Sequence, residues 1–216
     1  MAGLDLPPIE DLDVDDLASL PKEYRYELHE GNLVVMTPST YWHKVVARRL
    51  MFLLAAAGLE VLQNAGIRGD RPRDSRLPDL GVIHILPPDL ADYSNLPASE
   101  FRMVIEIVSE SSPNGEDTEK ARWYAAHSIP AYWVADRMPE RSHDDARIHL
   151  HRLALTDDGP AYVHERTVRL SELEAEYRAK SEDSSSPDRA QVWAENCDMN
   201  WISEAITSAM PPHTRR

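Results

Sequence analysis

The sequence predicts an α/β protein built on one mixed β-sheet with helices on its faces. A chain of 216 residues is long enough for one sizeable core, although not for two well-built domains. Its apolar segments are of two kinds, short runs of roughly four to eight residues bounded by turn residues and longer stretches with helical features. Strands and helices that alternate along a chain pack as layers around a shared sheet.

A hairpin and a long helix open the predicted domain. The segment 26–36 predicts two strands joined at Gly31 and Asn32, because a β-branched run follows this turn. From residue 41 to about 57, apolar residues recur with the 3.6-residue period of a helix, and Gly58 closes the segment.

The middle of the chain predicts the remaining strands and a second helix. The expected strands are 59–62, 80–86, 103–108, 131–135, 147–155 and 161–168, the last two forming a hairpin. A loop rich in Pro, Asp, Asn and Ser fills 87–99. The segment 115–127 predicts a helix, because acids gather in its first turns, where the helix dipole favours them.

The composition divides the chain into three parts. We expect an acidic lead-in at 1–20, a main domain at 21–170, and a linker with an appended helix at 171–216. The net charge is −14, from 23 Lys and Arg against 37 Asp and Glu. Residues 1–20 hold six acids and no base, and residues 171–188 hold six acids and two bases. The rest is close to balanced, so a local basic patch can still bind nucleic acid.

The appended helix carries an apolar stripe that includes Trp193 and Trp201. Such a stripe either docks on its own domain or binds a partner, and pairing of two chains into a homodimer is one use of it. No segment approaches the roughly 20 uncharged residues of a membrane span. The N-terminus lacks the features of a secretion signal, and Cys197 is the only cysteine, so we expect a cytoplasmic protein.

Glu106 is the most informative residue, because it lies in the middle of a strand that should be buried. An ionised carboxylate there costs several kcal/mol unless it is paired, hydrogen-bonded or bound to metal. Asp79 stands at the start of the preceding predicted strand. Acids on adjacent strands lie about 5 Å apart, a spacing that suits a hard cation such as Mg²⁺. The alternatives are a structural ion pair for Glu106 and a turn role for Asp79.

Lys120 adds a cation to these acids. It shares a helix face with Trp123, Tyr124 and His127, and this face should pack on the sheet. The ammonium should be drawn toward the carboxylates of the sheet, where it can stabilise charge developing on a phosphate or orient an attacking water. Metal, carboxylates and lysine together suit metal-assisted hydrolysis of a phosphodiester. The chain lacks a Gly-x-Ser-x-Gly elbow, a Walker loop, a dinucleotide-binding glycine motif and a cysteine pair for zinc.

These residues, taken in order, resemble the Uma-two family of restriction endonucleases. The resemblance is carried by Tyr26-Glu27-Leu28 with Glu30-Gly31, Pro78-Asp79, Val104-Ile105-Glu106-Ile107-Val108-Ser109, Lys120 with Tyr124, and Ile129-Pro130-Ala131-Tyr132-Trp133-Val134-Ala135-Asp136. It covers about residues 10–170. It implies a PD-(D/E)xK nuclease-like fold, in which a mixed sheet flanked by helices carries the acids that bind metal.

The resemblance also implies roles for single residues. Asp79 and Glu106 would bind Mg²⁺ or Mn²⁺, and Glu27 would be an additional acid near the metal. PD-(D/E)xK nucleases carry a lysine two residues after the strand acid, where this chain has Val108. The resemblance assigns the part of that lysine to Lys120, on the following helix.

Further residues are candidates with a plain alternative. His43 matches a position where the family often has histidine, although a histidine on a helix surface is usually just solvated. Ser109 either holds the Glu106 carboxylate or ends the strand. Four arginines precede Asp79 and form either a DNA-binding patch or an exposed loop. They are Arg68, Arg71, Arg73 and Arg76.

The sequence therefore supports two hypotheses of different classes. The first is a Mg²⁺- or Mn²⁺-dependent endonuclease that hydrolyses DNA phosphodiester bonds. The second is a nuclease fold without catalysis, which binds nucleic acid or protein and whose acids are structural. The set Asp79, Glu106 and Lys120 favours the enzyme, whereas the acidic balance and the appended helix favour interaction.

Overall fold

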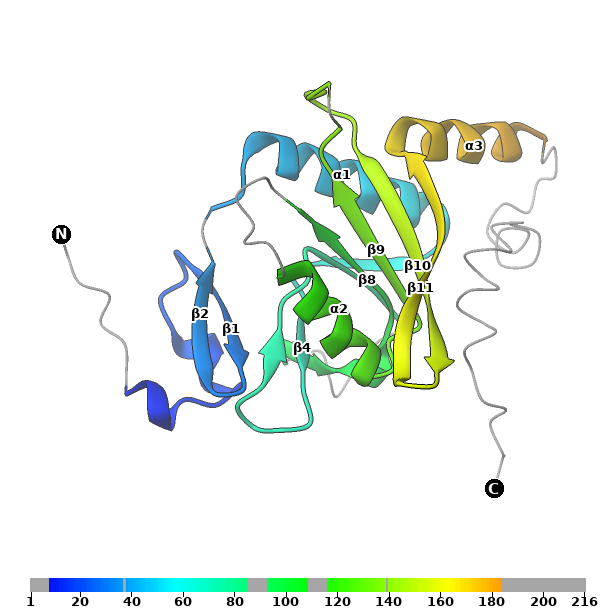
Figure 1. Cartoon of the computed structure of the whole chain (residues 1–216). Helices are drawn as coiled ribbons and strands as arrows, with labels where there is room; N and C mark the ends of the chain where they lie inside the picture. Colours follow the sequence, from blue (N-terminus) through cyan, green and yellow to red (C-terminus); the bar gives the residue numbers. More distant parts are fainter. Residues whose placement is uncertain (1–7, 37, 85–92, 109–115, 139, 184–216) are drawn as a thin grey trace.

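The described strands form two sheets rather than the single sheet expected (Figure 1). The structure is a computed structural model and describes residues 8–36, 38–84, 93–108, 116–138 and 140–183. We call the two sheets the hairpin sheet, with strand order β2-β1-β5-β4-β7, and the central sheet, with order β11-β10-β9-β8-β6-β3. The α/β class and the mixed sheet with helices on its faces are confirmed.

Each sheet collects strands from several parts of the chain. The hairpin sheet contains β1 (Arg25–His29), β2 (Asn32–Met36), β4 (Gly66–Arg68), β5 (Ser75–Arg76) and β7 (Asn95–Pro97). The central sheet contains β3 (Glu60–Gln63), β6 (Leu80–Ile83), β8 (Phe101–Ile107), β9 (Ala131–Asp136), β10 (Arg147–Thr156) and β11 (Gly159–Arg169). The helices are α1 (Tyr41–Ala56), α2 (Glu116–Ala126) and α3 (Leu170–Asp183).

The predicted hairpins, helices and long strands match this arrangement within a few residues. The differences are the shortest strands, because β4, β5 and β7 have only two or three residues each and so show no alternation. β7 and the short 3-10 turn Ala98–Glu100 lie in the segment expected to be a loop. Pairing with neighbouring strands, and not their own pattern, makes these residues extended.

Helices cover both faces of the central sheet (Figure 1). On one face, α1 and α3 bury Leu50, Leu54 and Leu173 against sheet residues such as Trp133 and Ile148. On the other face, α2 packs in front of the sheet through a second apolar cluster, formed by Val104, Tyr124, Ile129 and Tyr132 together with residues of the hairpin sheet. The middle strand β8 is therefore covered on both faces, which is why it is almost continuously apolar.

The acidic lead-in is not simply a solvated extension. Leu12, Val14, Leu17 and Leu20 are buried in a third apolar cluster against the hairpin strand β1, where they meet Leu28. This segment therefore forms part of the covering of the hairpin sheet.

Helix α3 occupies the region where a linker was expected to begin. Leu170 and Leu173 are buried in the main core. Arg49 on α1 donates two hydrogen bonds to Glu174, at 2.8 and 2.7 Å. Thus the core extends past residue 170. The apolar stripe with Trp193 and Trp201 lies outside the described residues. None of the helices in the described part of the chain is long and apolar enough to cross a membrane.

Gly81 provides a test of the packing between β6 and β8. A Cβ at this position would lie 2.6 Å from Cε1 of the buried Phe101 ring, too close for an ordinary contact. We expect Gly81→Ala to lower the free energy of unfolding by about 1–3 kcal/mol, measured by urea denaturation. The double variant Gly81→Ala/Phe101→Leu should lose less than the sum of the single changes. Additive losses would contradict the contact.

Candidate active site

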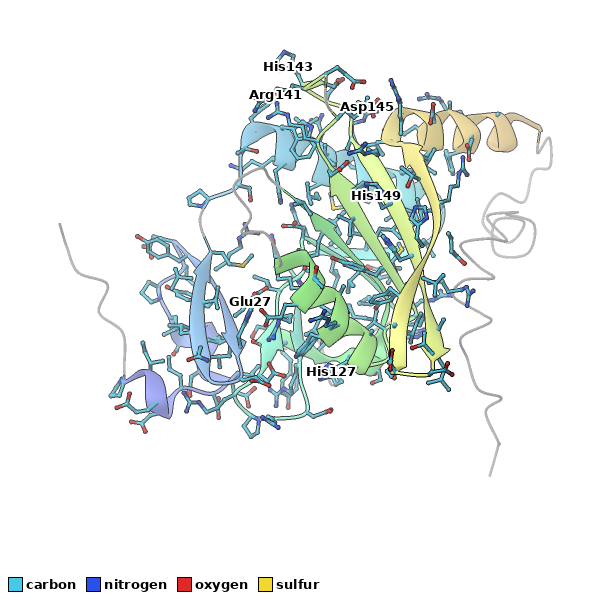
Figure 2. All side chains as sticks on the ribbon, in the orientation of Figure 1. Glu27, His127, Arg141, His143, Asp145 and His149 are labelled. Carbon is cyan, nitrogen blue, oxygen red and sulfur yellow. The ribbon has the colours of Figure 1, made fainter. Side chains whose placement is uncertain are left out.

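Four polar side chains from four elements meet where the hairpin sheet, the central sheet and α2 come together. Glu27 comes from β1, Asp79 from the residue before β6, Glu106 from β8 and Lys120 from α2. Figure 2 shows Glu27 on the side of β1 that faces α2. All four are buried, with exposed fractions from 1% for Glu27 to 8% for Glu106. Such a group of buried charges must be satisfied internally or by a ligand.

Glu106 is held by two residues of α2. Its Oε1 atom accepts hydrogen bonds from the Tyr124 hydroxyl at 2.6 Å and from the Lys120 ammonium at 3.2 Å. Lys120 and Tyr124 are four residues apart and therefore lie on one face of the helix. This face packs on the central sheet, as the sequence predicted, and the lysine reaches the carboxylate.

Glu27 shares the same lysine. Its Oε1 lies 2.9 Å from Nζ of Lys120 and accepts the backbone N–H of Leu77 at 2.8 Å. Its Oε2 lies 2.6 Å from Nε2 of His29. Both oxygens of this buried carboxylate thus contact protein groups, and one of these groups is the Lys120 ammonium.

Asp79 is anchored to the backbone beside Glu106. Its Oδ2 accepts the N–H of Ile107 at 2.8 Å, and Nε2 of His43 lies 3.0 Å from the same oxygen. Nη1 of Arg25 lies 4.0 Å from Oδ1. Because Ile107 follows Glu106 directly, the hydrogen bond fixes the two carboxylates on neighbouring points of adjacent strands.

Burial and the neighbouring groups shift the pKa values of Glu106 and Glu27 in opposite directions. Burial raises the pKa of Glu106 to about 8; the charge of Lys120 opposes this shift, whereas the charges of Asp79 and Glu27 add to it. For Glu27, burial also raises the pKa, but hydrogen bonds from His29, Lys120 and the Leu77 backbone and the lysine charge outweigh it, and the pKa falls to about 2.

The lysine remains charged in this setting. Burial lowers the pKa of Lys120, but the carboxylates of Glu106 and Glu27 outweigh that effect and raise the pKa above its ordinary value. One ammonium therefore faces two carboxylates directly, with a third, Asp79, nearby. Burial, reinforced by the charges of the neighbouring acids, favours the protonated form of Glu106.

The donor set fits a hard divalent cation, although it is not a fully formed cage. Among the residues that the structure describes, no group of three or more His, Cys, Asp or Glu side chains is arranged to hold a metal. Asp79 and Glu106 nevertheless supply carboxylate oxygens from adjacent strands. Mg²⁺ is commonly held by one or two carboxylates, with water and substrate completing its shell. Such an ion would offset the negative charges of the Asp79 and Glu106 carboxylates.

Comparison with known proteins identifies the family. The Uma2 family model, described as "Putative restriction endonuclease", matches residues 13–185. The chain belongs to the Uma2 family. This confirms the resemblance stated from the sequence, and the match extends past the expected limit of residue 170 to include α3. Membership supports an assignment as a nuclease.

A solved structure has the same fold as this Uma2 protein. It is described as "a putative nuclease belonging to DUF820" from Anabaena variabilis ATCC 29413, with a TM-score of 0.54 and 14% sequence identity. The alignment covers 77% of this chain and 99% of that chain. At this identity the likeness shows the fold alone. A search of the curated proteins finds no match.

Two residues of this Uma2 site were not identified from the sequence. His29 contacts Glu27, and Arg25 approaches Asp79. A signal was present, because Arg25, Glu27 and His29 alternate along β1 and therefore share one face of the strand. His43, which was identified, does contact Asp79 and is more than a solvated helix residue. Ser109 lies outside the described residues.

Two arginines of the segment before Asp79 are structural, so neither alternative for this segment, a DNA-binding patch or an exposed loop, describes these two residues. Arg76 is 2% exposed, and its Nη1 donates to the Leu28 carbonyl at 3.1 Å and to Asp74 at 2.8 Å. Nε of Arg73 donates to the Leu12 carbonyl at 2.9 Å. Both side chains tie the hairpin sheet together, because buried guanidinium groups need oxygen acceptors.

The other two arginines are more accessible. Arg68 is part-exposed and pairs with Asp15, and Arg71 is exposed. Contact with DNA therefore remains a prediction that fits Arg71 best.

The raised pKa of Glu106 predicts a stability that falls with pH. Between about pH 4.5 and 8 the folded protein keeps a proton on Glu106 that the unfolded chain has lost. The free energy of unfolding should therefore fall by several kcal/mol across this range and level off above it. Glu27, with its pKa lowered to about 2, adds stability above pH 4.5 and loses it only in stronger acid.

The measurement is urea unfolding of the wild type and Glu106→Gln at several pH values in this range. The difference in stability between the two proteins should shift in favour of the variant as the pH rises, because Gln has no proton to lose. A difference that stays constant with pH would contradict the raised pKa.

Proposed function

We propose that this Uma2 protein is a metal-dependent endonuclease that hydrolyses DNA phosphodiester bonds. The observation that carries the proposal is the convergence of Asp79, Glu106 and Lys120 on one buried point, where Lys120 contacts Glu106 at 3.2 Å and Asp79 holds the next backbone N–H. Two carboxylates that can bind a metal and a lysine that can stabilise charge on a phosphate suit metal-assisted phosphodiester hydrolysis. Family membership supports the same reaction class.

Asp79 and Glu106 would hold Mg²⁺ or Mn²⁺ in this proposal. When bound, the ion supplies Lewis-acid stabilisation of the phosphate and lowers the pKa of a coordinated water. Asp79 is kept in place by His43 and by the Ile107 N–H. Glu106, whose pKa is raised to about 8, must release its proton to serve as a ligand.

Lys120 would stabilise the negative charge that develops on the phosphate. Lys120 is 6% exposed and its ammonium is held by Glu27 and Glu106, so its position does not depend on the substrate. A preorganised cation of this kind stabilises a transition state without reorganisation during the reaction. Glu27 has a role different from the metal-side acid expected, because both of its oxygens are occupied by Lys120, Leu77 N–H and His29. It positions the lysine.

The proposal also covers the substrate, the pairing of two chains and the location in the cell. The substrate would be DNA, with Arg71 as an exposed cation close to the hairpin sheet. Pairing of two chains through the C-terminal stripe and a cytoplasmic location also remain predictions. The single cysteine, which lies outside the described residues, is the observation behind the location.

Cleavage assays test the site directly. Purified full-length protein should cut plasmid and linear single-stranded DNA with Mn²⁺ or Mg²⁺, and EDTA should stop the reaction. We expect Asp79→Ala, Glu106→Ala and Lys120→Met each to lower the rate roughly 100-fold or more. Controls are Glu60→Ala and Lys44→Met, which change exposed residues of β3 and α1.

The outcomes of the assays separate the two hypotheses. Cleavage that persists in the three site variants would overturn the assignment of the site. DNA binding without cleavage by folded wild-type protein would favour the non-catalytic nuclease fold instead.

Metal binding should depend on pH through Glu106. Because the ion must displace a proton whose pKa is about 8, the Mg²⁺ affinity should rise up to about tenfold per pH unit below that value. Titration calorimetry in two buffers of different ionisation enthalpy measures the affinity and the released proton together. Glu106→Gln should bind weakly without releasing a proton. An affinity that does not change with pH would contradict Glu106 as a ligand.

A further inference from the structure

We infer that His29 is a positioning residue of this site, which holds Glu27 in the one orientation that places Lys120 against Glu106. The inference rests on the proposed function for its effect on catalysis. Its structural part, the position of Lys120, stands on contacts of the described residues and can be tested separately.

His29 and Glu27 are neighbours on one face of β1. They are two residues apart on a strand, so their side chains point the same way. Nε2 of His29 lies 2.6 Å from Oε2 of Glu27, whereas the other oxygen of Glu27 contacts Lys120 and the Leu77 N–H. The carboxylate is thus held from both sides, and its freedom to rotate is removed.

The second nitrogen of the imidazole reaches α2. Nδ1 of His29 lies 3.6 Å from Oε1 of Glu119, the residue next to Lys120 in the helix. The same oxygen lies 3.4 Å from Nη2 of the buried Arg76. Two adjacent links, from His29 to Glu119 and from Glu27 to Lys120, therefore join the hairpin sheet to α2. The imidazole spans the gap because its two nitrogens point in different directions.

The backbone of the hairpin keeps His29 in place. Glu30 and Gly31, the turn residues that follow it, have φ values of 49° and 90°, and the side-chain amide of Asn32 donates to the His29 carbonyl at 3.1 Å. The Gly31 N–H donates to the Arg73 carbonyl at 2.7 Å. The end of β1 is therefore anchored on both sides of the turn, and the imidazole projects from a fixed point.

Loss of the imidazole should displace the lysine. Glu27 is 1% exposed, so an unpaired oxygen cannot be hydrated without movement. The carboxylate would turn to bring this oxygen to another donor, and Lys120, which lies 2.9 Å from the other oxygen of Glu27, would shift with it away from Glu106. Because His29 contacts Glu27 and Glu119, its influence on Glu106 passes through Glu27 and Lys120.

Chemical labelling of Lys120 in the full-length protein tests this position without an assay of activity. Acetic anhydride acetylates amines, and mass spectrometry follows the Lys120 peptide. We expect His29→Leu, which keeps the bulk but removes both nitrogens, to raise the labelling rate of Lys120 about fivefold or more. His29→Gln can still donate to Glu27 and should recover most of the protection. His127→Leu, which changes a half-buried histidine directly after the C-terminal end of α2, is the matched control and should leave the rate unchanged.

Kinetics give the second measurement. In the proposed reaction, His29→Leu should lower kcat roughly 10- to 100-fold with KM for DNA within about threefold, because the substrate is bound by other groups. His29→Gln should recover at least part of kcat. If His29→Leu does not fold, as judged by urea unfolding, His29→Asn replaces it, because this side chain is too short to reach Oε2 of Glu27.

The outcomes decide the inference and the proposed function separately. An unchanged labelling rate of Lys120 in folded His29→Leu or His29→Asn would overturn the inference, and so would His29→Gln as impaired as the leucine variant. A wild type that cuts no DNA would overturn the proposed function. The labelling rates would still show whether His29 keeps Lys120 in its position.

Discussion

The carboxylate of Glu106 is the constraint on which the rest of the site depends. It lies in the middle of β8, which is covered on both faces, and an unpaired charge there costs several kcal/mol. Lys120 and Tyr124 satisfy it from one face of α2, and this sets how the helix lies on the sheet. Lys120 in turn requires Glu27, so the hairpin sheet must dock against α2. One buried acid thus connects the three elements.

The protein groups around Glu106 do not fully offset the cost of burying its carboxylate, and the chemistry proposed for the site depends on this. Burial raises the pKa of Glu106 to about 8; the charge of Lys120 opposes this shift, and the charges of Asp79 and Glu27 add to it. A site whose acids were all neutralised by protein cations would have little use for a metal ion. Here two acids of the central sheet lie beside a preorganised cation, an arrangement that suits the proposed phosphodiester hydrolysis.

Two of the four arginines before Asp79 stabilise the fold, whereas the composition indicated contact with DNA. In a chain with a net charge of −14, four arginines beside Asp79 are natural candidates for DNA contact. Instead, Arg76 and Arg73 donate to backbone carbonyls of β1 and of the N-terminal segment. The short strands of the hairpin sheet offer few ladder hydrogen bonds, and these guanidinium groups replace them. Arg73 and Arg76 therefore stabilise the structure around the site and do not contact a substrate in this role.

The sequence by itself determined the secondary structure of the long elements and the identity of the central acids. The helical period of α1, the apolar run of β8 and the misfit of Glu106 within it are local features, and local features can be recognised from residue order. The second sheet, the contact of Lys120 with Glu27 and the burial of Arg76 were decided by tertiary structure alone. Each joins residues far apart in the chain or strands too short to show a pattern. Because a charge in a buried site is stable only with its partners, the role of each residue there was decided by which distant groups the fold brought to it.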